Sequence, residues 1–180
     1  MTEKQQQILI SAQKLFALEG VVAVSTARIA KEAGVSEALI FRHFGNKQQL
    51  VDTVVKAGLS AKSATINGIL HSPDAVTLVR AVLSIAAEAG NNRDVFLSWV
   101  AQLRAVRDSG VEISADRFMR ERLVWAVTEI GHARPAAVAS VIEAVLDQAV
   151  EFAFAGAADN AKNLCLGLQE LLINEVVLTY

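Results

Sequence analysis

The residues best suited to chemistry lie in the stretch IAKEAGVSEALIFRHFGNK, residues 29–47, which mixes polar and basic side chains with apolar ones. Arg42 and Lys47 are cations, His43 is a hydrogen-bonding group, and Phe41 lies beside them in the sequence. Side chains of these kinds bind backbone phosphates and contact the edges of bases. The stretch therefore favours contact with an anionic partner such as a nucleic acid.

Catalysis has little support in the rest of the chain. The three histidines, His43, His71 and His132, are scattered, and no Ser–His–Asp or metal-binding spacing accompanies them. The single cysteine, Cys165, excludes an internal disulfide and a cysteine-based metal cluster, and we interpret it as a buried apolar group. We expect no enzymatic activity, no metal and no cofactor.

Two short helical segments position the side chains of residues 29–47. Ser25 or Thr26 can cap the first, which ends at Gly34 because glycine adopts a left-handed conformation at little cost. Ser36 caps the second, in which Leu39, Ile40 and Phe44 face inward. Two helices joined by a short turn that contains glycine are the helix-turn-helix pattern, whose second helix lies in the major groove of DNA.

The composition of the 180-residue chain indicates an all-helical protein with an uneven charge. Hydrophobic residues make up 53% of the chain, and there are two prolines. The formal net charge is −2, but residues 1–50 hold six Lys or Arg against four Asp or Glu. A mildly basic N-terminal part is a hint of an anionic partner at that end.

Targeting and membrane segments are not expected. The first residues, MTEKQQQ, have no apolar run behind a basic one and do not resemble a signal peptide. No window approaches the roughly 18 apolar residues that a membrane span needs. We expect a cytoplasmic protein with no membrane partner.

Hydrophobic periodicity, caps and glycine stops predict nine helices. The fourth is the longest of the early ones, from Lys47 to about Leu70. We expect Ser72 and Pro73 to begin the fifth, and Ser114 to cap the seventh. The ninth is expected to run to the last residue, Tyr180.

Residues 8–55, beginning ILISAQKLFALEG and continuing VSTARIAKEAGVSEALIFRHFGNKQQLVDTVV, resemble the DNA-binding domain of the tetracycline-repressor (TetR) family of bacterial regulators. The match includes Ile-Leu-x-x-Ala-x-x-Leu-Phe-x-x-x-Gly and Ile-Ala-x-x-Ala-Gly-Val-Ser, followed by aromatic-x-His-Phe-x-x-Lys. No family motif is recognisable beyond residue 55. The resemblance implies nine helices, with a three-helix DNA-binding domain over 1–46. A long fourth helix then leads into a helical ligand-binding and dimerisation domain over 47–180.

The resemblance also places the DNA contacts residue by residue. Thr26, His43 and Lys47 are best placed for phosphates, Phe41 for a thymine methyl, and Arg42 for a phosphate or a guanine. The full expected set is Ser25, Thr26, Ser36, Glu37, Ala38, Phe41, Arg42, His43 and Lys47.

Three residues of the second short helix depart from the family pattern. Glu37 stands where many relatives carry lysine; it complements the helix dipole and repels phosphate, or accepts a hydrogen bond from cytosine. Ala38 replaces a common glycine, and Leu39 replaces a common threonine or asparagine. These departures bear on DNA affinity and operator sequence rather than on the fold.

The body of the chain carries two further sets of candidate residues. Aromatic stripes are ordinarily core, but these helices line a ligand pocket in the family, which predicts a largely apolar effector. The pocket candidates are Phe96, Trp99, Gln102, Leu103, Phe118, Arg122 and Trp125. The last two helices are apolar over broad faces, which predicts a homodimer interface formed by Val138, Val141, Val145, Ala149, Leu164, Leu168, Leu171 and Leu172.

The sequence is consistent with two functions. The first is a dimeric regulator, a repressor, that binds a palindromic DNA operator and is released by a small-molecule effector. The second is a helical protein-interaction module with the same fold and weak or no specific DNA binding, which Glu37 and the acidic pI of about 5.9 favour.

Overall fold

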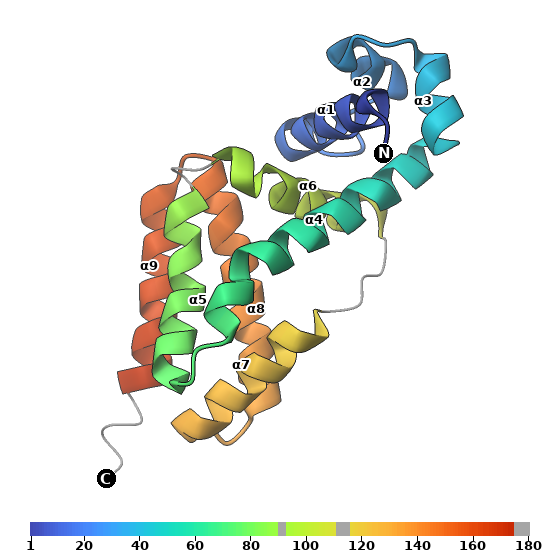
Figure 1. Ribbon diagram of the computed structural model, residues 1–180. Coiled ribbons are helices and arrows are strands. Elements are labelled where there is room, and N and C mark those ends of the chain that lie inside the picture. The colour runs from blue at the N-terminus through green and yellow to red at the C-terminus, as the bar shows by residue number, and fades with distance from the viewer. Residues whose placement is uncertain (90–92, 111–115, 175–180) are drawn as a thin grey trace. The chain divides into compact units, whose positions relative to one another are not determined.

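The structure, a computed structural model, describes residues 1–89, 93–110 and 116–174. Over these residues the chain forms nine α-helices and a π-helical segment, with no strand (Figure 1). None of the described helices combines the length and hydropathy needed to span a bilayer. The bounds are α1 (Glu3–Glu19), α2 (Thr26–Ala33), α3 (Glu37–Phe44), α4 (Lys47–Leu70), α5 (Ala75–Ala89), α6 (Arg93–Ser109), α7 (Arg117–Ile130), α8 (Pro135–Phe154), α9 (Ala158–Gln169) and η1 (Glu170–Asn174).

The helix-turn-helix has the caps that the sequence predicts. The Ser25 hydroxyl accepts from the amide of Arg28, and the Ser36 hydroxyl accepts from the amide of Leu39. Gly34 ends α2 in a left-handed conformation with φ 63° and ψ 37°. These local interactions fix the angle between α2 and α3, because each helix end is satisfied within the turn.

Two other helix starts differ from the prediction. The amide of Thr77 donates to the Asp74 carboxylate at 2.6 Å, so Asp74 caps α5 instead of Ser72, and Pro73 lies before the helix. Asp116 caps α7 by accepting from the amide of Met119, while Ser114 lies outside the described residues. In both cases an aspartate two residues further on supplies a charged acceptor for the first-turn amides.

The ninth helix is shorter than expected. α9 ends at Gln169 and continues as the π-helical segment η1 to Asn174. The last six residues of the expected helix, 175–180, lie outside the described residues.

Contacts divide the chain into two compact units. Unit 1 comprises Met1–Lys62 and Leu97–Ile113, and unit 2 comprises Ser63–Phe96 and Ser114–Tyr180. α4 and α6 each contribute to both. In unit 1, Ile8, Phe16, Ile29, Ile40 and Leu50 are fully buried and form the core beneath the helix-turn-helix.

Unit 2 is a helical bundle in which α5, α8 and α9 lie side by side and α7 packs on α5 and α8 (Figure 1). Its core is made by apolar residues at helical spacing, among them Leu78, Val82, Leu123, Ile142 and Leu146, all with no exposed surface. Burial of this apolar surface, at about 25 cal/mol per Å², is the main stabilising contribution to such a bundle.

Candidate nucleic-acid interface and ligand-binding residues

The outer surface of α3 presents three of the predicted DNA contacts to solvent. Ala38 and Arg42 are exposed, and 44% of the Phe41 surface remains accessible. The guanidinium of Arg42 has no ion pair within the described part of the chain. An exposed aromatic beside an unpaired arginine is suited to a base methyl and a phosphate or guanine edge.

The apolar side of α3 packs less completely than expected. Ile40 is fully buried, whereas Phe44, predicted as a core residue, is half-buried, as is His43. The partial burial of these two residues places the last turn of α3 at the edge of the unit 1 core.

The start of α2 is tied to the start of α3 by one side-chain hydrogen bond. The Thr26 hydroxyl donates to Glu37 Oε1 at 2.5 Å, in a half-buried position. The sequence suggested Thr26 as a phosphate donor and Glu37 as a residue facing DNA. In this arrangement the Thr26 hydroxyl proton is donated to the Glu37 carboxylate, so it is not available to a phosphate.

Lys47, the last of the predicted DNA contacts, also has an internal partner. Its ammonium donates to the Val21 carbonyl at 2.7 Å, and the Val21 amide donates to Asp108 on α6 at 2.8 Å. The loop between α1 and α2 is therefore held from both sides. Asp108 was absent from the expected site, and no local signal could have revealed it, because 87 residues separate the two groups.

Basic side chains around the helix-turn-helix are partly neutralised by acids on neighbouring turns. Lys14 pairs with Glu32 at 2.6 Å, and Arg28 lies 3.3 Å from Glu19 and 3.8 Å from the second oxygen of Glu32. The hydrogen bond and charge of Lys14, together with Arg28, hold the pKa of the Glu32 carboxyl below its usual value. This leaves a small positive surface, which predicts a shallow salt dependence of DNA binding.

Three of the expected pocket residues come together in unit 2. Phe118, Arg122 and Trp125 line a cavity of about 550 Å³ with residues 70–73. The Arg122 guanidinium donates to the carbonyls of Leu70 and Ser72, both at 2.7 Å, and lies 4.0 Å from the Trp125 ring centroid. Arg122 therefore holds the segment between α4 and α5 in place. These hydrogen bonds leave fewer of its N–H groups for a ligand.

The other four expected pocket residues lie elsewhere. Trp99 and Gln102 of unit 1 are 1% exposed and Leu103 is half-buried, while Phe96 of unit 2 is 2% exposed. The Lys62 ammonium lies 5.0 Å from the Trp99 ring centroid. The Gln102 carbonyl oxygen is buried and accepts no hydrogen bond from the described residues.

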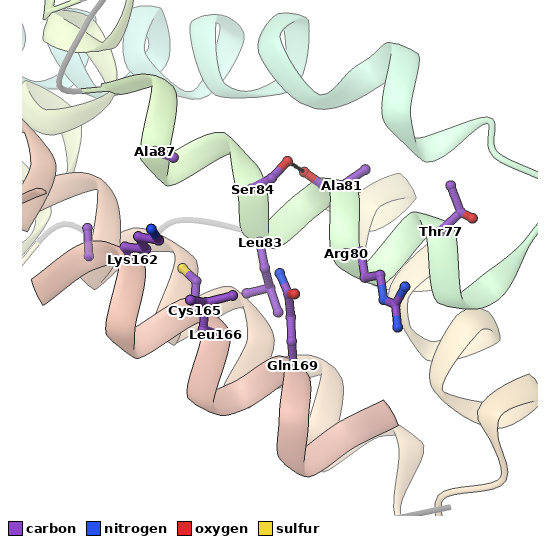
Figure 2. A pocket seen from close by; sticks show the side chains of 11 residues that line it. Thr77, Arg80, Ala81, Leu83, Ser84, Ala87, Lys162, Cys165, Leu166 and Gln169 are labelled. Carbon is purple, nitrogen blue, oxygen red and sulfur yellow. Dashed lines mark hydrogen bonds between the residues drawn. The ribbon is translucent and has the colours of Figure 1, made fainter. Parts of the chain in front are cut away.

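A second cavity of about 550 Å³, open to solvent, lies between α5 and α9 in unit 2 and contains none of the expected pocket residues (Figure 2). Arg80 and Leu83 line it from α5, and Lys162, Cys165 and Gln169 line it from α9. One signal for it is present in the sequence, because small residues occupy positions 81, 84 and 87 of α5, and all three line this cavity.

The expected dimer residues differ in how much surface they offer. Val141 is 49% exposed and Leu171 is 57% exposed, whereas Ala149 and Leu172 are buried within the single chain. Ala149 and Leu172 therefore hold unit 2 together and offer almost no surface to a partner. The remaining four, Val138, Val145, Leu164 and Leu168, are half-buried.

The capped turn, the short α3 with its exposed Phe41 and Arg42, and the all-helical body define a helix-turn-helix protein. The family model "Bacterial regulatory proteins, tetR family" matches residues 8–54. Residues 8–54 therefore have the sequence of the DNA-binding domain of this family of bacterial transcriptional regulators.

Individual relatives match the chain to different extents. The nucleoid occlusion factor SlmA of Vibrio campbellii is 34% identical over 86 residues, which are 47% of this chain and 44% of SlmA. The regulator HbdR of Aromatoleum sp. is 32% identical over 142 residues, covering 74% of this chain and 61% of HbdR. The chain therefore spans less than two thirds of the length of these curated relatives.

Solved structures share the fold over nearly the whole chain. A TetR-family regulator from Streptomyces coelicolor superposes with a TM-score of 0.73 at 20% identity, covering 97% of this chain and 96% of that one. AibR, in complex with isovaleryl coenzyme A and operator DNA, gives a TM-score of 0.71 at 14% identity, covering 95% and 98%. At these identities the similarity establishes the fold alone.

Proposed function

We propose that the chain is a ligand-responsive repressor that binds a palindromic operator as a homodimer. The observation that carries the proposal is the α3 surface, where Phe41 and Arg42 are exposed on a helix whose start is fixed by Ser36. In a helix-turn-helix dimer, two such helices enter successive major grooves about 34–36 Å apart.

Dimerisation is supported by exposed apolar side chains on the last helices. Val141 on α8 is 49% exposed, and Leu171, in the η1 segment that follows α9, is 57% exposed. Large apolar residues that gather on the surface mark interaction sites, and helix pairs of this kind assemble into four-helix interfaces. We therefore propose that α8 and α9 form the dimer interface.

A response to ligand is supported by the fold and by the contacts of α6. The structural relative AibR was crystallised with both an acyl coenzyme A and operator DNA. In this chain, Asp108 near the end of α6 holds the Val21 amide, and Lys47 at the start of α4 holds the Val21 carbonyl. A ligand that favours another position of α6 would change these contacts and shift the population away from the DNA-binding state.

DNA selection is the direct test of the proposal. Purified protein is mixed with sheared genomic DNA at about physiological salt, and the retained fragments are sequenced. We expect a few fragments that share an inverted repeat. Arg42→Ala should weaken binding to that repeat by about 10- to 100-fold, since a good arginine contact contributes about 1–3 kcal/mol.

The matched control is Arg134→Ala, which removes an exposed arginine from unit 2 and should leave DNA retention unchanged. Uniform or absent retention by the wild-type protein would contradict the proposal. It would favour the interaction module, a function that the internal use of Thr26, Glu37 and Lys47 makes a real alternative.

A further inference from the structure

The cavity between α5 and α9 combines an apolar lining with basic groups. Leu83 and Cys165 are buried in its walls, and Leu166 lies along one side. Its volume of about 550 Å³ falls within the range of small-molecule sites, about 300–1,000 Å³. Alanine or serine occupies positions 81, 84 and 87 of α5, and these small side chains leave space at the cavity lining.

Two cations lie at different ends of this cavity. Figure 2 shows Arg80 and Gln169 projecting into the gap at one end, and Lys162 at the other end, below Ala87. Neither Arg80 nor Lys162 forms an ion pair with a residue that the structure describes, although the charge of Arg80 reaches Asp74 at the start of α5. None of the 11 lining residues is acidic.

We propose that this cavity binds an acyl carboxylate, an organic anion with a chain of medium length. The carboxylate lies against Arg80, whose planar guanidinium donates two parallel hydrogen bonds, and the Gln169 amide donates a third. The chain lies along Leu83, Cys165 and Leu166, and Lys162 adds to the positive potential. An uncharged molecule of the same shape loses the contacts at Arg80.

The proposal gives a chemical class to the effector and rests on the proposed function only for its regulatory consequence. Carboxylate binding is measured without DNA. A chain that does not bind the carboxylate can therefore still bind an operator. Conversely, a chain that retains no operator can still bind the carboxylate.

The test uses octanoate as the probe and 1-octanol as its uncharged counterpart, with isothermal titration calorimetry on the full chain. We expect octanoate to bind at least tenfold more tightly than 1-octanol. Arg80→Gln should weaken octanoate binding by about tenfold, because it removes a charge-assisted hydrogen bond. Arg134→Gln, the same change at an exposed arginine elsewhere in unit 2, should have no effect.

Cys165 reports occupancy at the same time, since it is the single cysteine of the chain and lies in the cavity wall. Saturating octanoate should slow its modification by N-ethylmaleimide, followed by intact mass. Ala81→Leu, which fills the cavity from α5, should abolish octanoate binding while circular dichroism confirms that the helices are intact.

Four results would overturn the proposal. They are no heat of binding with octanoate, equal affinity for octanoate and 1-octanol, an unchanged affinity of Arg80→Gln, and labelling of Cys165 at the same rate with and without octanoate. If sedimentation shows a dimer that does not bind octanoate, a second copy of the chain is the better occupant of this face.

Discussion

The helix-turn-helix and the α5–α9 cavity use their polar side chains in opposite ways. In the helix-turn-helix, Thr26, Glu37 and Lys47 form hydrogen bonds inside the fold. Around the cavity, Arg80 and Lys162 have no ion-pair partner among the described residues. In the helix-turn-helix, these hydrogen bonds hold the geometry of the exposed α3 surface. In the α5–α9 cavity, cations lie beside an apolar lining without forming ion pairs among the described residues.

α4 has one glycine in each unit, Gly58 and Gly68, and the surroundings of these two glycines differ. A Cβ at Gly58, in unit 1, would lie 2.4 Å from the Ser98 carbonyl oxygen and 2.2 Å from Gln102 Cβ. A Cβ at Gly68, in unit 2, would meet no atom within 4 Å.

The largest expected effect follows from this contrast. Gly58→Ala should destabilise the protein by about 1–3 kcal/mol, since α6 backbone must move to admit the methyl group. Gly68→Ala should instead stabilise it by about 0.5–1 kcal/mol, the ordinary helix preference for alanine over glycine. Urea denaturation followed by circular dichroism measures both. Equal effects at the two sites would show that α4 and α6 are not tightly packed at Gly58.

A second, smaller effect is expected at the bond between α2 and α3. Glu37→Gln removes a negative charge from α3, the helix proposed to contact DNA, and weakens the hydrogen bond that Glu37 accepts from the Thr26 hydroxyl. We expect DNA affinity to rise about three- to fivefold at moderate salt, because a like charge near phosphate costs about 1 kcal/mol in water.

Thr26→Val provides the matched test of that bond. If the Thr26–Glu37 hydrogen bond positions α3, the double variant should be non-additive, with a coupling of about 0.5 kcal/mol or more in DNA binding. Filter binding across a salt series measures all four proteins. A fall in affinity for Glu37→Gln that Thr26→Val does not share would instead assign Glu37 a direct contact with a base.

The two regions also differ in how far their structure could be predicted from sequence. Ser25, Gly34 and Ser36 act on residues within a few positions, so the caps and the turn were predictable. The Val21–Asp108 bond and the α5–α9 cavity depend on residues tens of positions apart, which no local pattern encodes. The start of α5 was missed for another reason: Ser72, Pro73 and Asp74 all favour helix starts, and the aspartate was the cap.

The smallest expected effect concerns the paired charges of unit 1. The pKa of the Glu32 carboxyl lies below its usual value of about 4.5, mainly through the hydrogen bond and charge of Lys14. A carboxyl with a lowered pKa in the folded state adds stability that is present above the unfolded pKa. This stability is lost as the pH falls through the folded pKa.

Glu32→Gln should therefore lower the urea midpoint slightly at pH 7, by less than Gly58→Ala, and the difference from wild type should disappear as the pH falls through the lowered pKa of the Glu32 carboxyl. The exposed pair is screened by salt, so the difference should also shrink at high ionic strength. Glu129→Gln, an exposed change on α7, is the control and should show neither dependence. A difference that persists once the Glu32 carboxyl is protonated would mean that Glu32 stabilises the α1–α2 contact through packing rather than charge. The charge of Glu32 would then not contribute to stability, and the contrast between the paired charges of unit 1 and the cations of the α5–α9 cavity would have no energetic consequence at this site.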